Sequence, residues 1–335
     1  MTIPYVTDID PEYGKVVEVS PSVRRVIANN PGRFTFTGTG TYIIGRGQVA
    51  VIDPGPENDD HVAAIIAGLP GEEISHIVVT HTHKDHSPAS RALQTATGAP
   101  IYGFGRHPVL PEEEVLRSKP TTWDMLLPTP EELEELKKSM AFPSDDENEH
   151  EQDEPGDMAF NPDVEIGHGD LIKGGTWTLE AVHTPGHISN HLCFGFKEER
   201  SLFSGDHVMG WSTSVIPSPE GAMGEYMDSL YLLLDRNDKF FYPTHGPRIP
   251  EPISFTRSLI AHRQDREQQI LNCLSEGPMA IPDLVMKMYV ETPHILYMAA
   301  GQSVYSHLVY MVQKGMVETE GAPSADGIYR LGSTK

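Results

Sequence analysis

Residues 74–90 read ISHIVVTHTHKDHSPAS, and this stretch predicts both a strand and a functional site. Positions 74–80 are a β-branched run with little polar alternation, which is typical of a strand buried on both faces. Ser87 is a favourable N-cap and Pro88 suits the first helical position, so a helix is expected over about 88–97. The histidines and the aspartate between them lie on a loop after a buried strand, where a rigid scaffold usually carries its chemistry.

Four residues in this loop are of the types that bind metal ions: His81, His83, Asp85 and His86. Side chains two apart on an extended segment point to the same side, so His81 and His83 can share one ion. Asp85 and His86 follow a turn of the chain and can reach a second ion. Three more such residues each follow an expected strand further along; they are His187, Asp206 and His245. Zinc takes imidazole and carboxylate ligands, and the two oxygens of Asp206 are what a bridging ligand needs.

The number and type of these ligands favour a catalytic site over a structural one. Seven nitrogen and oxygen ligands exceed one closed tetrahedral site, and structural zinc sites usually use cysteine. Only two cysteines occur, Cys193 in an expected strand and Cys273 in an expected helix, so both are expected in the core. Two ions that share a water lower its pKa to about 7, so hydroxide is available to attack a carbonyl carbon or a phosphorus. Asp85 is expected to ligate the second ion and to orient this nucleophile.

Expected strands and helices alternate around these loops, which indicates an α/β layered domain. Positions 41–44 and 48–53 flank a Gly45-Arg46-Gly47 turn and predict a hairpin. A short helix is expected over 60–69. Further strands are expected at four places, 177–182, 191–196, 201–204 and 239–242.

Residues 104–165 are expected to form an insertion in this domain, because the pattern of strands and helices breaks after residue 101. A capping box at Thr129-Pro130-Glu131-Glu132 predicts the start of a charged helix. Eight of the fourteen residues in 144–157 are acidic and none is basic, which is typical of a solvated, mobile loop. Two roles stay open for the insertion: it keeps the protein in solution, or it forms a lid or specificity wall over the site.

The chain changes character at about residue 251. Helices are expected over 253–274, 281–289 and 295–314, and a two-stranded wing over 316–319 and 327–331. This order is a winged-helix pattern, but seven basic and nine acidic residues give the segment a net charge of −2, without a basic stripe on the third helix. A packing or dimerising module is therefore favoured over a DNA-binding one. Its apolar faces either pair two copies into a homodimer or pack on the main domain.

Composition narrows the class of protein further. The 335 residues include 25 lysines and arginines against 48 aspartates and glutamates, a net charge of −23 that disfavours nucleic acid as a partner. This length predicts about two domains. No secretory signal, membrane span or disulfide framework is visible, so we expect a cytoplasmic protein that acts on a small-molecule substrate, away from membranes.

Four motifs in order resemble those of the metallo-β-lactamase superfamily with a glyoxalase-II-like ligand pattern: HTHKDH (81–86), HTPGH (183–187), SGDH (204–207) and THG (244–246). The stretch AHRQDREQQIL (261–271), followed by the winged-helix pattern, is similar to the lactamase-β-2-like branch. The resemblance implies an αββα sandwich over 1–250 with two zinc ions at the sheet edge, and a winged-helix-like domain over 251–335. By motif position it implies these ligands: His81, His83 and His187 for the first ion, Asp85, His86 and His245 for the second, and Asp206 as the bridge.

The leading hypothesis is a dinuclear zinc hydrolase in which a metal-bound hydroxide attacks an ester, thioester, lactone or amide carbonyl. The branch resemblance supports an alternative, a zinc-dependent endoribonuclease acting on single-stranded RNA, although the chain lacks the expected basic surface. Two further hypotheses stay open, since one fold carries many chemistries. One is a metal enzyme that reduces oxygen or oxidises sulfur, because related ligand sets hold iron. The other is a non-enzymatic regulator that uses the winged helix.

Several side chains near the ligands have two open interpretations. Asp53 in the sequence VIDPG is either a turn former or a carboxylate that accepts a hydrogen bond from a ligand histidine. One of three neighbouring histidines donates a proton to the leaving group, or all are structural; they are His183, His191 and His207. The loop after Asp206 either lines the pocket or is a plain connection, with Trp211, Ser212 and Ser214 as candidates.

Overall fold

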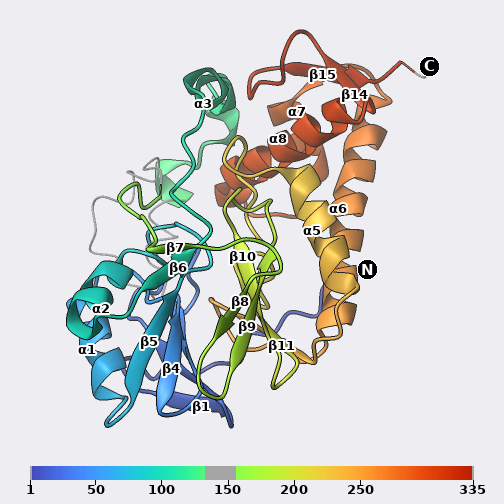
Figure 1. Ribbon diagram of the computed structural model, residues 1–335. Helices are drawn as coiled ribbons and strands as arrows, with labels where there is room; N and C mark the ends of the chain where they lie inside the picture. Colours follow the sequence, from blue (N-terminus) through green and yellow to red (C-terminus); the bar gives the residue numbers. More distant parts are fainter. Residues whose placement is uncertain (1, 133–155, 334–335) are drawn as a thin grey trace.

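The computed structural model describes residues 2–132 and 156–333, and its main body is a sandwich of two β-sheets between helices (Figure 1). The seven-stranded sheet has the order β1-β2-β3-β4-β5-β6-β7, and the five-stranded sheet has the order β12-β11-β10-β9-β8. Helices α1 (Asp59–Ala67) and α2 (Ala89–Thr97) cover the outer face of the first sheet. Helices α5 (Met223–Leu234) and α6 (Pro252–Leu274) cover the outer face of the second. The αββα sandwich expected from the sequence is thus confirmed.

Strand direction brings the ends of several strands to one edge of this sandwich. The first sheet contains β1 (Val17–Ser20), β2 (Val23–Ile27), β3 (Gly40–Ile44), β4 (Gln48–Ile52), β5 (Glu73–Val78), β6 (Ile101–Gly103) and β7 (Val164–Glu165). The second contains β8 (Leu171–Lys173), β9 (Thr178–His183), β10 (Leu192–Phe196), β11 (Ser201–Gly205) and β12 (Phe240–Pro243). Strands β4 and β5 are parallel, and so are β11 and β12, while β9 and β11 are both antiparallel to β10. The carboxyl ends of β9, β11 and β12 therefore point the same way.

Alternation along the strands produces the layers. In β4, Ile52 points between the two sheets and Val51 points toward α1 and α2. In β10, Phe194 lies in the same inter-sheet core and Cys193 faces the cluster around α5. Both faces of these strands are apolar because each sheet is covered on both sides. Cys193 is fully buried as expected, whereas Cys273 is only partly buried.

The elements that the sequence did not predict are short or lack a local signal. Strands β1, β2, β6, β7 and β8 have five residues or fewer, so they leave little periodicity to detect. Helix α5 has Ala222 at its N-cap position and no side-chain cap. Helix α2 begins at Ala89 and its N-cap position is Pro88, so the expectation that Ser87 caps it was wrong. The Ser87 hydroxyl instead donates to Asp157 Oδ2 at 2.9 Å.

The described part of the insertion binds to the C-terminal region. After α3 (Glu112–Ser118), the Thr121 and Thr122 hydroxyls donate to the Asp326 carboxylate at 2.6 and 2.7 Å. Trp123 and Leu126, at the 3-10 helix η1 (Asp124–Leu126), are buried in the core of that region. The expected capping box forms, since the Thr129 and Glu132 side chains each accept the other's backbone N–H. Most of the charged helix expected after it and most of the acidic stretch 144–157 lie outside the described residues.

The C-terminal region combines three helices with a small sheet, at the upper right of Figure 1. After α6 come α7 (Ile281–Met288), the 3-10 helix η2 (His294–Leu296) and α8 (Tyr297–Gln313). The sheet has the order β13 (Met279–Ala280), β15 (Ile328–Leu331) and β14 (Val317–Thr319). The apolar face of α6 is divided, because Leu259 packs against α5 and the second sheet while Leu274 packs against α7 and α8. No helix in the described ranges is both long enough and apolar enough to cross a bilayer.

Trp123 joins the insertion to the C-terminal region, so its removal tests that contact. The indole is 2% exposed, a Cβ at Gly301 of α8 would lie 2.6 Å from its ring, and its Nε1 donates to the Ala325 carbonyl at 3.1 Å. We predict that Trp123→Ala lowers the free energy of unfolding by about 3 kcal/mol, as expected for a truncated buried aromatic residue. The free energy of unfolding is measured by urea denaturation, monitored by circular dichroism. Met125→Ala in the same turn is the control, because that side chain is 55% exposed; equal effects of the two variants would contradict the prediction.

Candidate metal centre

All seven predicted ligands lie on loops that follow strand ends at one edge of the sandwich. The 81–86 loop follows β5, and His187 lies in the loop after β9. Asp206 follows β11 directly, and His245 comes two residues after β12. Their ligand atoms form three overlapping groups, each within 4.8 Å: His81, His83 and His187; His81, His86 and Asp206; Asp85, His86 and His245. The structure thus brings together residues spread over 165 positions of the chain.

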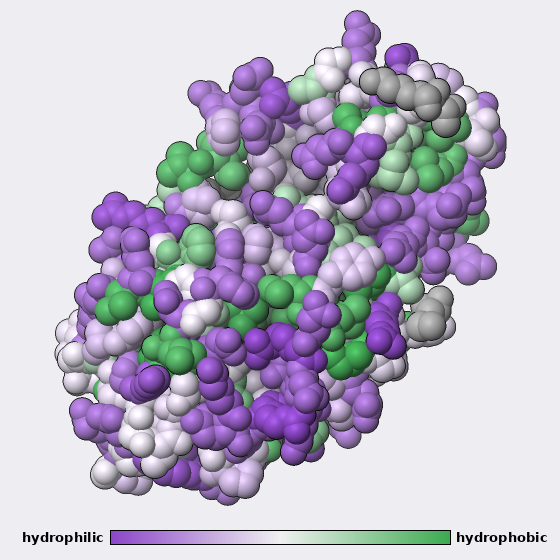
Figure 2. Space-filling view, turned by 45° about the vertical axis from the view of Figure 1, so that its right-hand side comes forward, coloured by the Kyte–Doolittle hydropathy of each residue, from purple (hydrophilic) through white to green (hydrophobic). Residues whose placement is uncertain are grey.

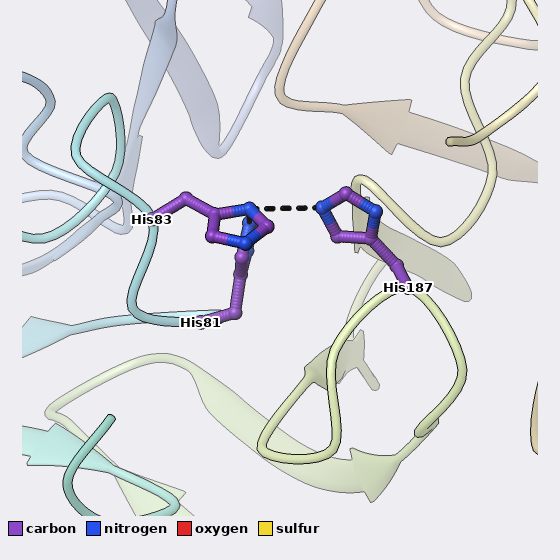
Figure 3. A group of neighbouring side chains, drawn as sticks. All are labelled: His81, His83 and His187. Atoms are coloured by element: carbon purple, nitrogen blue, oxygen red, sulfur yellow. Dashed lines mark hydrogen bonds between the residues drawn. The ribbon is translucent and has the colours of Figure 1, made fainter. Parts of the chain in front are cut away.

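Three imidazoles form the first group (Figure 3). His81 Nε2 and His187 Nε2 each lie 3.0 Å from His83 Nδ1. His187 Nδ1 is 2.6 Å from the Val215 carbonyl, which can only accept, so this nitrogen has the proton and Nε2 has a lone pair. His83 Nε2 lies 3.3 Å from Glu220 Oε1, which accepts its proton, so Nδ1 of His83 has the lone pair. Nitrogens that all present lone pairs cannot hydrogen-bond to one another, and a cation fits between them.

Two histidines and a carboxylate form the second group. His245 Nε2 lies 3.1 Å from Asp85 Oδ2, and His86 Nε2 lies 3.4 Å from the same oxygen. The opposite ring nitrogens are again held by acceptors: His86 Nδ1 by Asp53 Oδ2 at 2.9 Å, and His245 Nδ1 by the Gly38 carbonyl at 3.3 Å. Each Nε2 therefore faces inward as a possible ligand atom.

Asp206 lies between the two groups. Its Oδ2 is 3.6 Å from His86 Nε2 and 3.9 Å from His187 Nε2, and its Oδ1 is 3.5 Å from His245 Nε2. Among the described residues, Asp206 Oδ1, His86 Nε2 and His245 Nε2 are buried without a hydrogen-bond partner. Buried polar atoms are normally paired, so three orphaned ligand atoms at one point fit a site for divalent cations.

The electrostatics of the two groups differ. Burial, aided by the neighbouring histidines, holds the pKa of His81 well below its usual value and lowers the pKa of His187 to about 4, so both imidazoles are neutral. At His86, burial opposes protonation, but the carboxylates of Asp85, Asp206 and Asp53 outweigh it and hold the pKa well above its usual value. The second group therefore attracts positive charge, either as a proton or as a metal ion.

Asp53 ties the strands to the ligand loops. Its fully buried carboxylate accepts four hydrogen bonds, from the Thr80 backbone N–H, the Thr80 and Thr244 hydroxyls and His86 Nδ1, at 2.8 to 2.9 Å. Of the two interpretations left open by the sequence, the structure shows the bond to a candidate ligand histidine. Asp53 also has a positive φ of 49°, so it occupies the turn position as well.

The neighbouring histidines have structural contacts rather than a place between the ligands. His191 Nδ1 lies 2.9 Å from the Thr184 hydroxyl, and its Nε2 accepts the Asp206 backbone N–H at 3.2 Å. His207 is fully buried, and burial lowers its pKa to about 3, so it is neutral rather than a cationic acid near neutral pH. His183 stacks on Phe104, with ring centroids 4.3 Å apart.

The candidates in the loop after Asp206 divide between two roles. Trp211 stacks on Phe36 at 5.0 Å, and its ring abuts Gly246, beside His245. The Ser214 hydroxyl donates to the His207 carbonyl, so Ser214 braces the loop, and the Ser212 hydroxyl donates only locally to Thr213. Glu220 and the Val215 carbonyl were not predicted from the sequence, because a single loop glutamate and a backbone acceptor have no motif.

Asp53→Asn is predicted to weaken metal binding by about 10- to 100-fold, as is typical when a partner that orients a ligand is lost. An amide has one acceptor oxygen and would turn an N–H toward groups that donate. Competition with a chromophoric chelator measures the zinc affinity. Asp59→Asn, at the exposed first turn of α1, is the matched control. An unchanged affinity in Asp53→Asn would show that this carboxylate does not orient the ligands.

Comparisons with known proteins identify the family of this chain. The family model of the metallo-beta-lactamase superfamily matches residues 35–245. Lactamase-like protein adaB of Aspergillus niger is 27% identical, with 96% of this chain and 90% of that protein aligned. The beta-lactamase-like protein 2 homolog of Drosophila melanogaster is 29% identical (93% and 94% aligned). An atrochrysone carboxyl ACP thioesterase of Claviceps purpurea is 27% identical (85% and 78% aligned).

Solved structures show the same fold over nearly the whole chain. A beta-lactamase domain protein from Burkholderia ambifaria superimposes with a TM-score of 0.71 at 19% identity, covering 97% of this chain and 96% of that one. A metallo-beta-lactamase family protein from Thermus thermophilus gives 0.66 at 19% identity, covering 94% and 100%. With the family match, these likenesses show that the chain belongs to the metallo-beta-lactamase superfamily and is one of its metal-dependent hydrolases.

Proposed function

We propose that this protein is a dinuclear zinc hydrolase that cleaves acyl thioesters or esters of small or medium size. The observation that carries the proposal is the convergence of five imidazoles and two carboxylates in three overlapping groups, with Asp206 between the two outer ones. In this proposal His81, His83 and His187 hold one ion, Asp85, His86 and His245 hold the other, and Asp206 bridges. When bound, such a pair lowers the pKa of water to about 7 and polarises the carbonyl group under attack.

Exposure supports a role for Asp85 in orienting the nucleophile. The side chains of Asp85 and His83 are 25% and 21% exposed, whereas those of His86 and His245 are fully buried, so a substrate reaches the site from the Asp85 side. Burial opposes ionisation of Asp85, but His86 and His245 hold its pKa well below the usual value. An ionised carboxylate at the open side can accept a hydrogen bond from the attacking water and fix its direction.

The surroundings favour an acyl substrate over a phosphate polymer. The stacked Phe36 and Trp211 form an apolar wall next to Gly246, and Val215, whose carbonyl accepts the His187 proton, is 43% exposed. Apolar side chains gather in patches on an otherwise largely polar face (Figure 2). A relative described as a thioesterase adds support for thioester cleavage. The net charge of −23 argues against the alternative, cleavage of single-stranded RNA.

We also propose a division into a catalytic domain over about 1–250 and a winged-helix-like domain over 251–335. Its support is the order of α6, α7 and α8 before the β14–β15 wing. The shared clusters around α6 favour packing on the catalytic domain. Two unpaired cysteines are consistent with a cytoplasmic location.

His83→Ala is predicted to lower the rate of hydrolysis of a small acyl thioester by more than about 100-fold. Loss of a residue that only orients a metal ligand costs about 10- to 100-fold, and His83 is a proposed ligand itself. His183→Ala is the control, because this histidine ends β9, just before the loop that carries His187, but stacks on Phe104. The measurement is kcat/KM with thioester and ester substrates. Equal kcat/KM values for His83→Ala and the unmodified protein would contradict the proposal that His83 binds a catalytic metal ion.

Removal of metal by a chelator is predicted to abolish hydrolysis, and two equivalents of zinc are predicted to restore it. Elemental analysis of the purified protein and titration with zinc, manganese or iron identify the metal that supports turnover. Restoration by iron alone, with consumption of oxygen, would favour the oxidative alternative. Cleavage of single-stranded RNA at low ionic strength, with all thioesters and esters left intact, would favour the nuclease.

A further inference from the structure

The loop between β11 and α5 orients two ligand histidines of the first group. Its Val215 carbonyl accepts the His187 Nδ1 proton at 2.6 Å, and its Glu220 carboxylate faces His83 Nε2 at 3.3 Å. These contacts decide which nitrogen of each imidazole has the lone pair, and which way the ring faces. The geometry of the first metal group therefore depends on what holds this loop.

Two side chains from the C-terminal helices hold the loop on either side of Val215. Arg263 of α6 donates from a guanidinium nitrogen to the Ser214 carbonyl at 2.6 Å. Ser306 of α8 donates to the Ile216 carbonyl at 2.5 Å. The peptide groups before and after the Val215 carbonyl are thus fixed by α6 and α8.

Arg263 is a buried charged residue, so its guanidinium needs contacts such as the bond to the Ser214 carbonyl to offset the loss of water. Its side chain is 3% exposed, and its guanidinium lies over the Tyr226 ring at 5.2 Å. Burying a charged group costs several kcal/mol unless other contacts compensate. Tyr226 in turn touches the chain next to His187, because a Cβ at Gly186 would lie 2.3 Å from the Tyr226 Cα. Arg263 thus contacts two groups next to His187: the loop, through the Ser214 carbonyl, and α5, through Tyr226.

We propose that Arg263 and Ser306 are positioning residues for the first metal ion. They lock the Val215 carbonyl against His187 Nδ1, so the C-terminal helices take part in setting up the metal centre. The inference rests on the proposed function, since it assumes that His81, His83 and His187 bind an ion. It adds a role for α6 and α8 that requires neither nucleic acid nor a second copy of the chain.

The test compares Arg263→Met with Arg266→Met. Arg266 lies in the same helix, and its guanidinium packs over Tyr289 of the C-terminal region, so its replacement removes the same charge without touching the loop. We expect Arg263→Met to weaken one of the two zinc equivalents by about tenfold, the lower end for groups that orient ligands. Arg266→Met should leave both affinities unchanged. Chelator competition measures each equivalent, and thermal unfolding of the metal-free variants measures the loss of stability separately.

Ser306→Ala provides a milder second variant in case Arg263→Met does not fold. It removes one hydroxyl, and Ser275→Ala, which removes a Ser–carbonyl bond to Asn272 at the end of α6, is its control. We expect Ser306→Ala to weaken one zinc equivalent severalfold, and Arg263→Lys, which keeps a donor, to retain more affinity than Arg263→Met. The visible spectrum of the cobalt-substituted variants should change for the affected site.

Two outcomes overturn the inference. One is that Arg263→Met and Ser306→Ala lose stability but bind both zinc equivalents as the unmodified protein does, which indicates a purely structural contact. The other is that Arg266→Met and Ser275→Ala weaken zinc binding equally. Failure of the unmodified protein to bind two ions would instead contradict the proposed function, so the two failures are distinguishable.

Discussion

Five imidazoles and two carboxylates share a small, largely buried space, and positive charge among them, as a proton or a metal ion, stabilises this arrangement. Each histidine has an acceptor or hydroxyl at the ring nitrogen that faces away, such as the Val215 carbonyl at His187 and Asp53 at His86. The lone pairs are thereby turned inward, where they would repel one another without a cation. The fold can be understood as the set of supports that keeps these side chains in place.

The sandwich supplies most of those supports from strand ends. Asp53 at the end of β4 receives hydrogen bonds from Thr80 after β5 and from Thr244 after β12. A single carboxylate therefore links the two sheets at the edge where the ligand loops emerge. The apolar core between the sheets sets the distance across which this link forms.

The regions outside the sandwich are connected to the site rather than appended to it. The insertion contributes Trp123 to the C-terminal core, and its return segment places Asp157 against Ser87, directly after the 81–86 loop. The C-terminal helices hold the loop that carries Val215 and Glu220. The described residues of the insertion thus contact both the C-terminal core and the start of α2.

The sequence alone determined the family, the αββα fold and the ligand candidates, because metal-binding side chains follow strands at fixed local spacings in HTHKDH, HTPGH, SGDH and THG. For Asp53, one of the two interpretations left open by the sequence was a hydrogen bond from a ligand histidine, and the structure shows this bond to His86. Tertiary structure alone decided the partners of the ligands: the Val215 carbonyl, Glu220, and behind them Arg263 and Ser306. The physical reason is that backbone carbonyls have no sequence signal, and contacts between distant elements depend on how the layers pack rather than on any local pattern of residues.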